Sequence, residues 1–188
     1  MRQFHSLVIG FVLLFLPLAA AIADSYQKTI DIFRGAGESA AFFDNSVGYA
    51  VFPTVGKGGY FIGGAYGEGR VYQGGRYVGD TRMTQLTLGL QLGGQAYSQI
   101  VFFQDERAFK DFTSGSYEFG AQASVVAITA GAQVAAGSAG NSAGVSGGQR
   151  DAKTVGGFYK GMAVFTIAKG GLMYEATVGG QKFDYRPL

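Results

Sequence analysis

The sequence predicts a mainly β protein of the α+β class, with a curved or barrel-like antiparallel sheet and short helices at the amino end and in mid-chain. Glycine supplies 32 of the 188 residues, about 17% against a usual ~7%. Aromatic and β-branched residues are interleaved with these glycines, as in twisted strands where glycine permits bulges. Leu86, Leu88, Leu90 and Leu92 alternate with other residues at the strand period of two.

The first helix is expected directly after Asp24 and Ser25, which are good N-cap residues. Tyr26, Ile30 and Phe33 follow at the spacing i, i+4, i+7 and would form one apolar stripe. Two further short helices are predicted downstream, at residues 38–43 and 106–112.

The strands follow in chain order, separated mostly by glycine turns. We expect them at residues 49–52 (stopped by Pro53), 59–66, 69–73, 76–78, 86–92, 97–103, 117–128, 158–159, 162–167 and 172–178. Gly74-Gly75 predicts a hairpin turn. Residues 130–148, almost wholly Gly, Ala and Ser, form either a long loop or a pair of small-residue strands.

The amino end has the layout of a secretory signal peptide. Arg2 is positive, residues 7–18 are mainly apolar, and Ala21-Ile22-Ala23 provides small residues at a cleavage site. The apolar core of roughly 12 residues is short of the ~20 that span a bilayer. We therefore expect a signal peptide at 1–23, one domain at 24–188, and a periplasmic or otherwise extracytoplasmic location. Without cysteine, the protein is not expected to be a lipoprotein.

The composition excludes several functions. Cleavage would remove Arg2, so 15 basic residues become 14 against 13 acidic ones, and no basic run exists that could follow a nucleic acid backbone. The single histidine, His5, lies in the signal peptide and cysteine is absent. Imidazole and thiol chemistry are therefore lost. We expect no enzyme, no metal site and no cofactor.

Three catalytic interpretations fail on their context. Residues 140–144 (GNSAG) match a nucleophile elbow around Ser142, but a histidine base is missing. Residues 56–59 (GKGG) lack the spacing of a phosphate-binding loop, although Lys57 could still meet a headgroup phosphate. Asp105-Glu106 is more typical of a helix cap than of an acid/base pair. No catalytic residue is assigned.

Several spaced segments occur in an order that resembles the SYLF domain, a lipid-binding family. They are residues 48–53 (GYAVFP), 63–70 (GGAYGEGR), 88–98 (LGLQLGGQAYS), 100–103 (IVFF), 124–127 (SVVA) and 169–173 (KGGLM). The resemblance extends over essentially the whole domain.

The resemblance implies binding to phospholipids. Eukaryotic members bind phosphoinositides through an amino-terminal amphipathic helix and a basic surface, and some bind actin, while bacterial members are commonly exported. In this sequence the first helix has only Lys28 and Arg34 as basic residues, which argues against strong phosphoinositide selectivity. Export argues against actin as a partner.

Lipid or membrane-surface binding is thus the first functional hypothesis. Headgroup contacts are predicted for Lys28, Arg34, Lys57 and Arg70, and acyl or membrane contacts for Tyr26, Ile30 and Phe33. The alternative for this apolar stripe is that it packs on the sheet. Glu68 and Arg70 share a strand face and form either an ion pair or a ligand-orienting pair. A second route to lipid is a cavity beside Gly89, Gly93 and Gly94.

The second hypothesis is a structural or interaction protein of the envelope that binds another protein through its sheet surface. The side chains of Tyr60, Tyr66, Tyr72 and Tyr77 would then be contact residues.

Overall fold

The structure, a computed structural model, describes residues 23–59, 62–88, 95–119, 125–128, 158–169 and 180–188. Several predictions fall outside these residues: the signal peptide up to residue 22, Tyr60, residues 130–148 with Ser142, the strand at 172–178, and Gly89, Gly93 and Gly94. Within the described segments, no helix is both long and apolar enough to cross a membrane.

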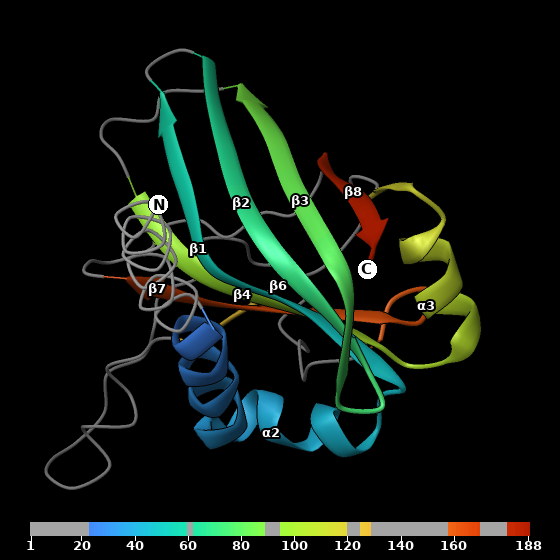
Figure 1. Cartoon of the computed structure of the whole chain (residues 1–188). Helices are drawn as coiled ribbons and strands as arrows, with labels where there is room; N and C mark the ends of the chain where they lie inside the picture. The colour runs from blue at the N-terminus through green and yellow to red at the C-terminus, as the bar shows by residue number, and fades with distance from the viewer. Residues whose placement is uncertain (1–22, 60–61, 89–94, 120–124, 129–157, 170–179) are drawn as a thin grey trace, which may run out of the picture.

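One curled sheet dominates the described part of the chain. Its strands are β1 Gly48–Gly59, β2 Ile62–Gln73, β3 Arg76–Leu88, β4 Gln95–Phe103, β5 Ser116–Glu118, β6 Val125–Ile128, β7 Met162–Lys169 and β8 Gln181–Pro187. They are arranged in the order β5-β8-β3-β2-β1-β4-β7-β6 (Figure 1). Neighbours are antiparallel except for β6 and β7. The sheet is not closed into a barrel; the predicted mainly β class with a curved sheet is confirmed.

The curl brings distant strands together across a concave face. Gln99 on β4 and Gln181 on β8 are separated in the sheet by β3, β2 and β1, yet Nε2 of Gln99 donates to Oε1 of Gln181 at 2.9 Å. The rings of Phe52 on β1 and Phe183 on β8 lie 5.7 Å apart. Helix α3 (Glu106–Thr113) packs Phe112 against Phe183, with ring centroids 5.1 Å apart. The larger apolar core fills this concave face.

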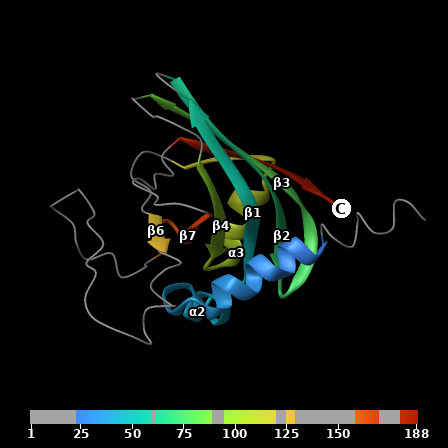
Figure 2. The ribbon, with the colours of Figure 1, turned by 90° about the vertical axis from the view of Figure 1, so that its left-hand side faces the viewer.

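Two helices cover part of the convex face. The N-terminal helix (residues 23–35) and α2 (Gly37–Asp44) lie on the side of the sheet away from α3 (Figures 1 and 2). Tyr26, Ile30 and Phe33 are 9%, 3% and 0% exposed and belong to a second apolar cluster with β1, β4 and β7. Apolar residues on both sheet faces explain why β1 and β4 are buried along most of their length.

The hairpin between β2 and β3 forms at the predicted glycine pair. Gly74 and Gly75 have φ angles of +55° and +78°, a conformation that side-chain-bearing residues rarely adopt.

The predictions for the first three strands are wrong in their extent. Strand β1 does not stop at Pro53 but continues through it, because a register shift between Phe52 and Val55 accommodates a residue that cannot donate a ladder hydrogen bond. Strand β2 is one continuous element where the sequence predicts strands at 59–66 and 69–73. Strand β3 is likewise continuous over Arg76–Leu88, where the sequence predicts strands at 76–78 and 86–92. Leu86 also lies on the open convex face, 81% exposed, although its period-two pattern predicted an apolar face.

Three boundaries were misplaced or missed. Asp24 and Ser25 do not cap the first helix, because the helix includes residue 23; Asp24 instead pairs with Lys28 at 2.5 Å one turn later. Residues 117–128 form two separate strands, β5 and β6. Strand β8 was not predicted at all.

Candidate functional site

Three strands each have the same short charged motif: an acidic residue, one spacer and an arginine. The motifs are Glu68-Gly69-Arg70 on β2, Asp80-Thr81-Arg82 on β3 and Asp184-Tyr185-Arg186 on β8. Residues two apart on a strand share a face. Gly69 and Thr81 are buried and Tyr185 is half-buried, whereas the charged residues are exposed or half-buried. The charged side chains therefore lie on the convex face.

Antiparallel pairing converts these motifs into alternating charges. Strand β3 lies between β2 and β8 and runs opposite to both, so each acidic residue has an arginine as its cross-strand neighbour. Cross-strand Cβ atoms are typically about 4.5–5.5 Å apart. We call the six side chains the charge array, and its formal charges, three positive and three negative, sum to zero. Its two rows are Glu68, Arg82, Asp184 and Arg70, Asp80, Arg186.

The charge array lines a groove of about 340 Å³ on the convex face. Tyr26 of the N-terminal helix also lines it, together with Gly69, Thr81 and Tyr185. The groove thus lies where the N-terminal helix meets β2, β3 and β8. It is large enough for a phospholipid headgroup or a small polar molecule.

Arg70 is held between two aromatic rings at the side of the groove. Its guanidinium carbon lies 4.4 Å from the ring centroid of Tyr26 and 4.8 Å from that of Tyr77. Cation–π contacts of this kind contribute roughly 0.5–1 kcal/mol each at exposed sites. Arg70 therefore links the helix to the sheet, in addition to its place in the charge array.

Two acidic residues of the array accept hydrogen bonds from tyrosines. The hydroxyl of Tyr77 donates to Oδ1 of Asp80 at 2.6 Å, and that of Tyr66 donates to Oε1 of Glu68 at 2.7 Å. Burial, followed by this bond to Asp80, raises the pKa of Tyr77 to about 12. The bond to Glu68 is the main cause of a raised pKa at Tyr66.

The array is not closed by direct ion pairs. In the described segments such pairs join Lys28 to Asp24 and Arg107 to Asp105 and Asp111, all outside the groove. The predicted pair of Glu68 and Arg70 shares a face, but the two side chains are engaged with tyrosines. Among the described residues, no ion pair within 4 Å therefore neutralises the charges of the array.

The apolar stripe of the first helix packs on the sheet, the alternative that the sequence left open. Tyr26, Ile30 and Phe33 are buried in this arrangement. The hydroxyl of Tyr26 reaches the carbonyl of Glu68 at 3.5 Å, and burial raises the pKa of Tyr26. A lipid-binding role for these three residues stays a prediction.

The four predicted headgroup residues do not converge. Arg70 alone lies in the groove. Lys28 is on the exposed face of the N-terminal helix, and Arg34 lies over the ring of Phe43 at 4.9 Å. Lys57 shares a strand face with Val55, a concave-side core residue, and thus lies on the other side of the sheet.

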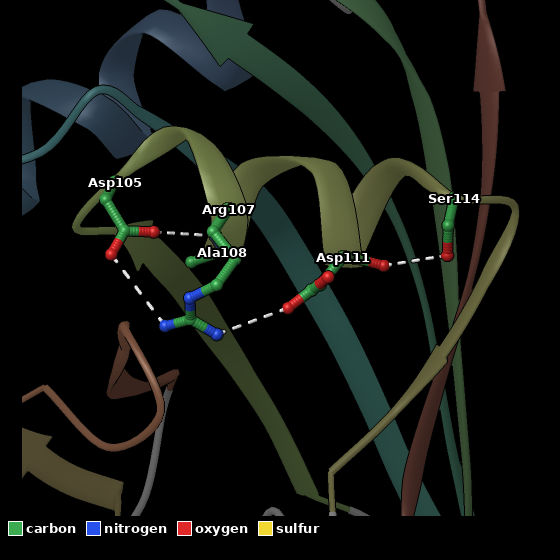
Figure 3. Close-up of polar contacts among 5 residues, drawn as sticks. All are labelled: Asp105, Arg107, Ala108, Asp111 and Ser114. Carbon is green, nitrogen blue, oxygen red and sulfur yellow. Dashed lines mark hydrogen bonds and ion pairs between the residues drawn. The ribbon is translucent and has the colours of Figure 1, made fainter.

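Asp105 and Glu106 have structural partners, as expected of a helix cap; Figure 3 shows those of Asp105. Oδ1 of Asp105 accepts a hydrogen bond from the backbone nitrogen of Ala108 at 2.8 Å, and Arg107 approaches both Asp105 and Asp111. Glu106 accepts from Nε2 of Gln73 at 3.1 Å. Neither residue lines the groove.

A second polar cluster lies in the concave core. Gln181 exchanges hydrogen bonds with Gln99 and approaches Gln85 at 3.4 Å and the hydroxyl of Tyr97 at 3.5 Å. All four side chains are at most 5% exposed. Their polar groups are directed mainly toward one another, so we assign this cluster a structural role.

Sequence reasoning missed Asp80, Arg82, Asp184 and Arg186. A signal was present, because the acid–spacer–arginine motif occurs in three segments with strand-like alternation. In the register of this sheet, antiparallel neighbours with this motif place opposite charges side by side. Both the order of the strands and their register were needed to find this arrangement.

Comparison with known proteins identifies the family of this chain. A family model described as "Ysc84: Las17-binding protein actin regulator" matches residues 84–187, more than half of the chain. This chain belongs to the Ysc84 family. The resemblance to the SYLF domain is thereby confirmed. Within this Ysc84-family chain the match includes Asp184 and Arg186 and begins after the other four residues of the charge array.

A curated relative is also similar to this Ysc84-family protein. The chain is 26% identical over 157 residues to beta cell expansion factor A from Aeromonas veronii. The alignment covers 82% of this chain and 51% of the relative, so the chain spans about half the length of that protein.

Proposed function

We propose that this Ysc84-family protein is an exported, non-catalytic protein that binds phospholipid at a membrane surface, with the groove as its headgroup site. The observation that supports it best is one open sheet face with both the charge array and two exposed apolar side chains, Tyr66 and Leu86.

Tyr66 and Leu86 continue the convex face beyond the charged rows. They are 48% and 81% exposed. Tyr66 lies opposite Thr84, and Leu86 lies opposite Gly64, so the two side chains are near neighbours on β2 and β3. An aromatic residue with a polar tip and an aliphatic residue are suited to the boundary between headgroups and acyl chains.

Arg82 and Arg186 are the residues we assign to the headgroup phosphate. Both are exposed and line the groove. Guanidinium groups match phosphate oxygens with paired, charge-assisted hydrogen bonds. In this proposal Arg70, held between its two rings, positions the helix at the groove.

The remaining parts of the proposal come from composition and family. Loss of His5 with a signal peptide leaves no imidazole for acid/base chemistry, which supports a non-catalytic role. The family resemblance supports lipid binding. The family's description as a binding protein and actin regulator favours a second candidate, a protein partner on the same open face.

The test is vesicle flotation with double variants that each remove two positive charges. The full chain is expressed, and mass spectrometry of the purified product establishes whether residues 1–23 were removed. Arg82→Gln with Arg186→Gln tests the groove, and Lys28→Gln with Arg34→Gln tests the helix. Lys110→Gln with Lys160→Gln, both exposed and outside the groove, is the matched control.

We expect the wild-type protein to float with phospholipid vesicles. The groove variant should bind them with an affinity at least about tenfold lower, since two charge-assisted contacts are lost. The control should bind as the wild type does. If no vesicle recruits the wild-type protein, lipid binding is wrong and the protein-partner candidate gains. Loss of binding in the helix variant alone would move the site to Lys28 and Arg34.

A further inference from the structure

We infer that the groove selects a zwitterionic headgroup with a phosphate and a primary ammonium, the phosphatidylethanolamine class, over a polyanionic headgroup. This inference depends on the proposed function and specifies the ligand of the same site. Its first support is charge balance: three arginines alternate with three carboxylates along the groove. A polyanion attracted by the arginines would also meet three negative charges.

Three of the six side chains in the charge array already have aromatic or tyrosine partners, which leaves three for a ligand. Asp80 and Glu68 each accept a tyrosine hydroxyl, and Arg70 is stacked between two rings. The exposed Arg82, Asp184 and Arg186 complete the array. Arg82 also interacts with the hydroxyl of Tyr66. This hydroxyl is uncharged, and a guanidinium has five N–H donors, so Arg82 keeps donors for a phosphate.

The arrangement of these three residues matches the two charges of ethanolamine phosphate. Asp184 lies opposite Arg82 across the strands and shares a strand face with Arg186. A phosphate bound by the arginines would therefore have a carboxylate one side-chain spacing away, about 4.5–5.5 Å between Cβ atoms. Two carbons separate phosphate oxygen from ammonium in ethanolamine phosphate, so one headgroup can meet both charges.

The acidic partner favours a primary ammonium over choline. The carboxylate of Asp184 can accept charge-assisted hydrogen bonds from N–H groups. A trimethylammonium group has no N–H and prefers the face of an aromatic ring. The rings of Tyr26 and Tyr77 beside the groove already contact Arg70.

The test compares three vesicle types: phosphatidylcholine alone, and phosphatidylcholine mixed with an equal share of phosphatidylethanolamine or of anionic phosphatidylglycerol. The wild-type protein is expected to bind the ethanolamine vesicles several-fold more tightly than the other two. Asp184→Asn should remove this preference, so that binding to the ethanolamine vesicles falls several-fold with the loss of one charge-assisted contact. Asp44→Asn, at the exposed end of α2, makes the same charge change away from the groove and should keep it.

Soluble phosphoethanolamine should compete with the vesicles, whereas glycerol phosphate should not. Preference for phosphatidylglycerol, or equal behaviour of the Asp184 and Asp44 variants, would overturn the inference while leaving lipid binding intact. Failure of the wild-type protein to bind all three vesicle types would instead remove the proposed function.

Discussion

The guanidinium carbon of Arg70 lies 4.4 Å from the ring centroid of Tyr26, so a strand arginine fastens the N-terminal helix to the convex face of the sheet. The same arginine belongs to the charge array and stacks on Tyr77 from the other strand of the hairpin. Arg70 therefore contributes both to the docking of the helix, beside the buried Ile30 and Phe33, and to the geometry of the groove.

Replacing Arg70 should destabilise the fold more than replacing its neighbour in the array. Arg70→Ala removes two ring contacts and is expected to lower the free energy of unfolding by about 1–2 kcal/mol. Arg82→Ala, on the same face, should change it by about 0.5 kcal/mol or less, as for most surface substitutions. Urea unfolding of both variants measures the difference. Equal losses would show that the ring contacts of Arg70 are not stabilising.

Gly69, the spacer between Glu68 and Arg70, should not tolerate a side chain. A Cβ there would lie 2.5 Å from the Phe52 ring and 2.9 Å from the carbonyl oxygen of Val51. Gly69→Ala should cost about 1–3 kcal/mol by overpacking. Gly56→Ala is the matched control, since nothing lies within 4 Å of its added Cβ. If thermal unfolding gives the same midpoint for both variants, the close packing of β2 on β1 is refuted.

Stability should fall in alkaline solution with a contribution from Tyr77. Its pKa is about 12 in the folded protein against 10.0 for an unperturbed tyrosine. Between these values the folded state holds the proton that the unfolded state loses, so the contribution is complete below pH ~10 and disappears toward pH ~12. Tyr77→Phe cannot ionise and should show a shallower decline of unfolding free energy over this interval. Parallel pH profiles for the two proteins would contradict the assignment.

The glutamine cluster of the concave core should be sensitive to loss of one member. Gln181→Leu keeps the side-chain size but removes both hydrogen bonds between Gln181 and the buried amide group of Gln99, which costs about 1–3 kcal/mol. Lys182→Leu, its exposed neighbour on β8, serves as control and should change stability little. Denaturant midpoints decide between them. An unchanged midpoint for Gln181→Leu would mean that the cluster does not connect β8 to β4.

Local patterns in the sequence predicted the elements that depend only on residues close together in the chain. The spacing of Tyr26, Ile30 and Phe33 predicted the first helix, and Gly74-Gly75 predicted the hairpin, because both depend on neighbours in the chain. Strand β8 was missed because residues 181–187 alternate buried and charged residues without a β-branched side chain, and such a segment is recognisable only beside its partner β3.

The charge array needed the tertiary arrangement for the same reason. Its motifs on β3 and β8 lie roughly 100 residues apart in the chain. Nothing in the local sequence of either strand indicates that the two strands pair. The sequence predicted Arg70 as a headgroup contact. It predicted the two tyrosines that stack on Arg70 separately, Tyr26 as a membrane contact and Tyr77 as a protein contact. In the folded protein Arg70 contacts both Tyr26 and Tyr77 beside the groove.

The central claim, that lipid headgroups bind at the groove, is tested most directly by NMR of the arginine side chains. The full chain is labelled with ¹⁵N, and the Nε–Hε signals of Arg70, Arg82 and Arg186 are followed while a short-chain, monomeric phosphatidylethanolamine is added. We predict saturable shifts at Arg82 and Arg186, with smaller changes at Arg70 and none at Arg107. Shifts confined to Arg34 on the helix, or no shifts at any arginine, would contradict the claim.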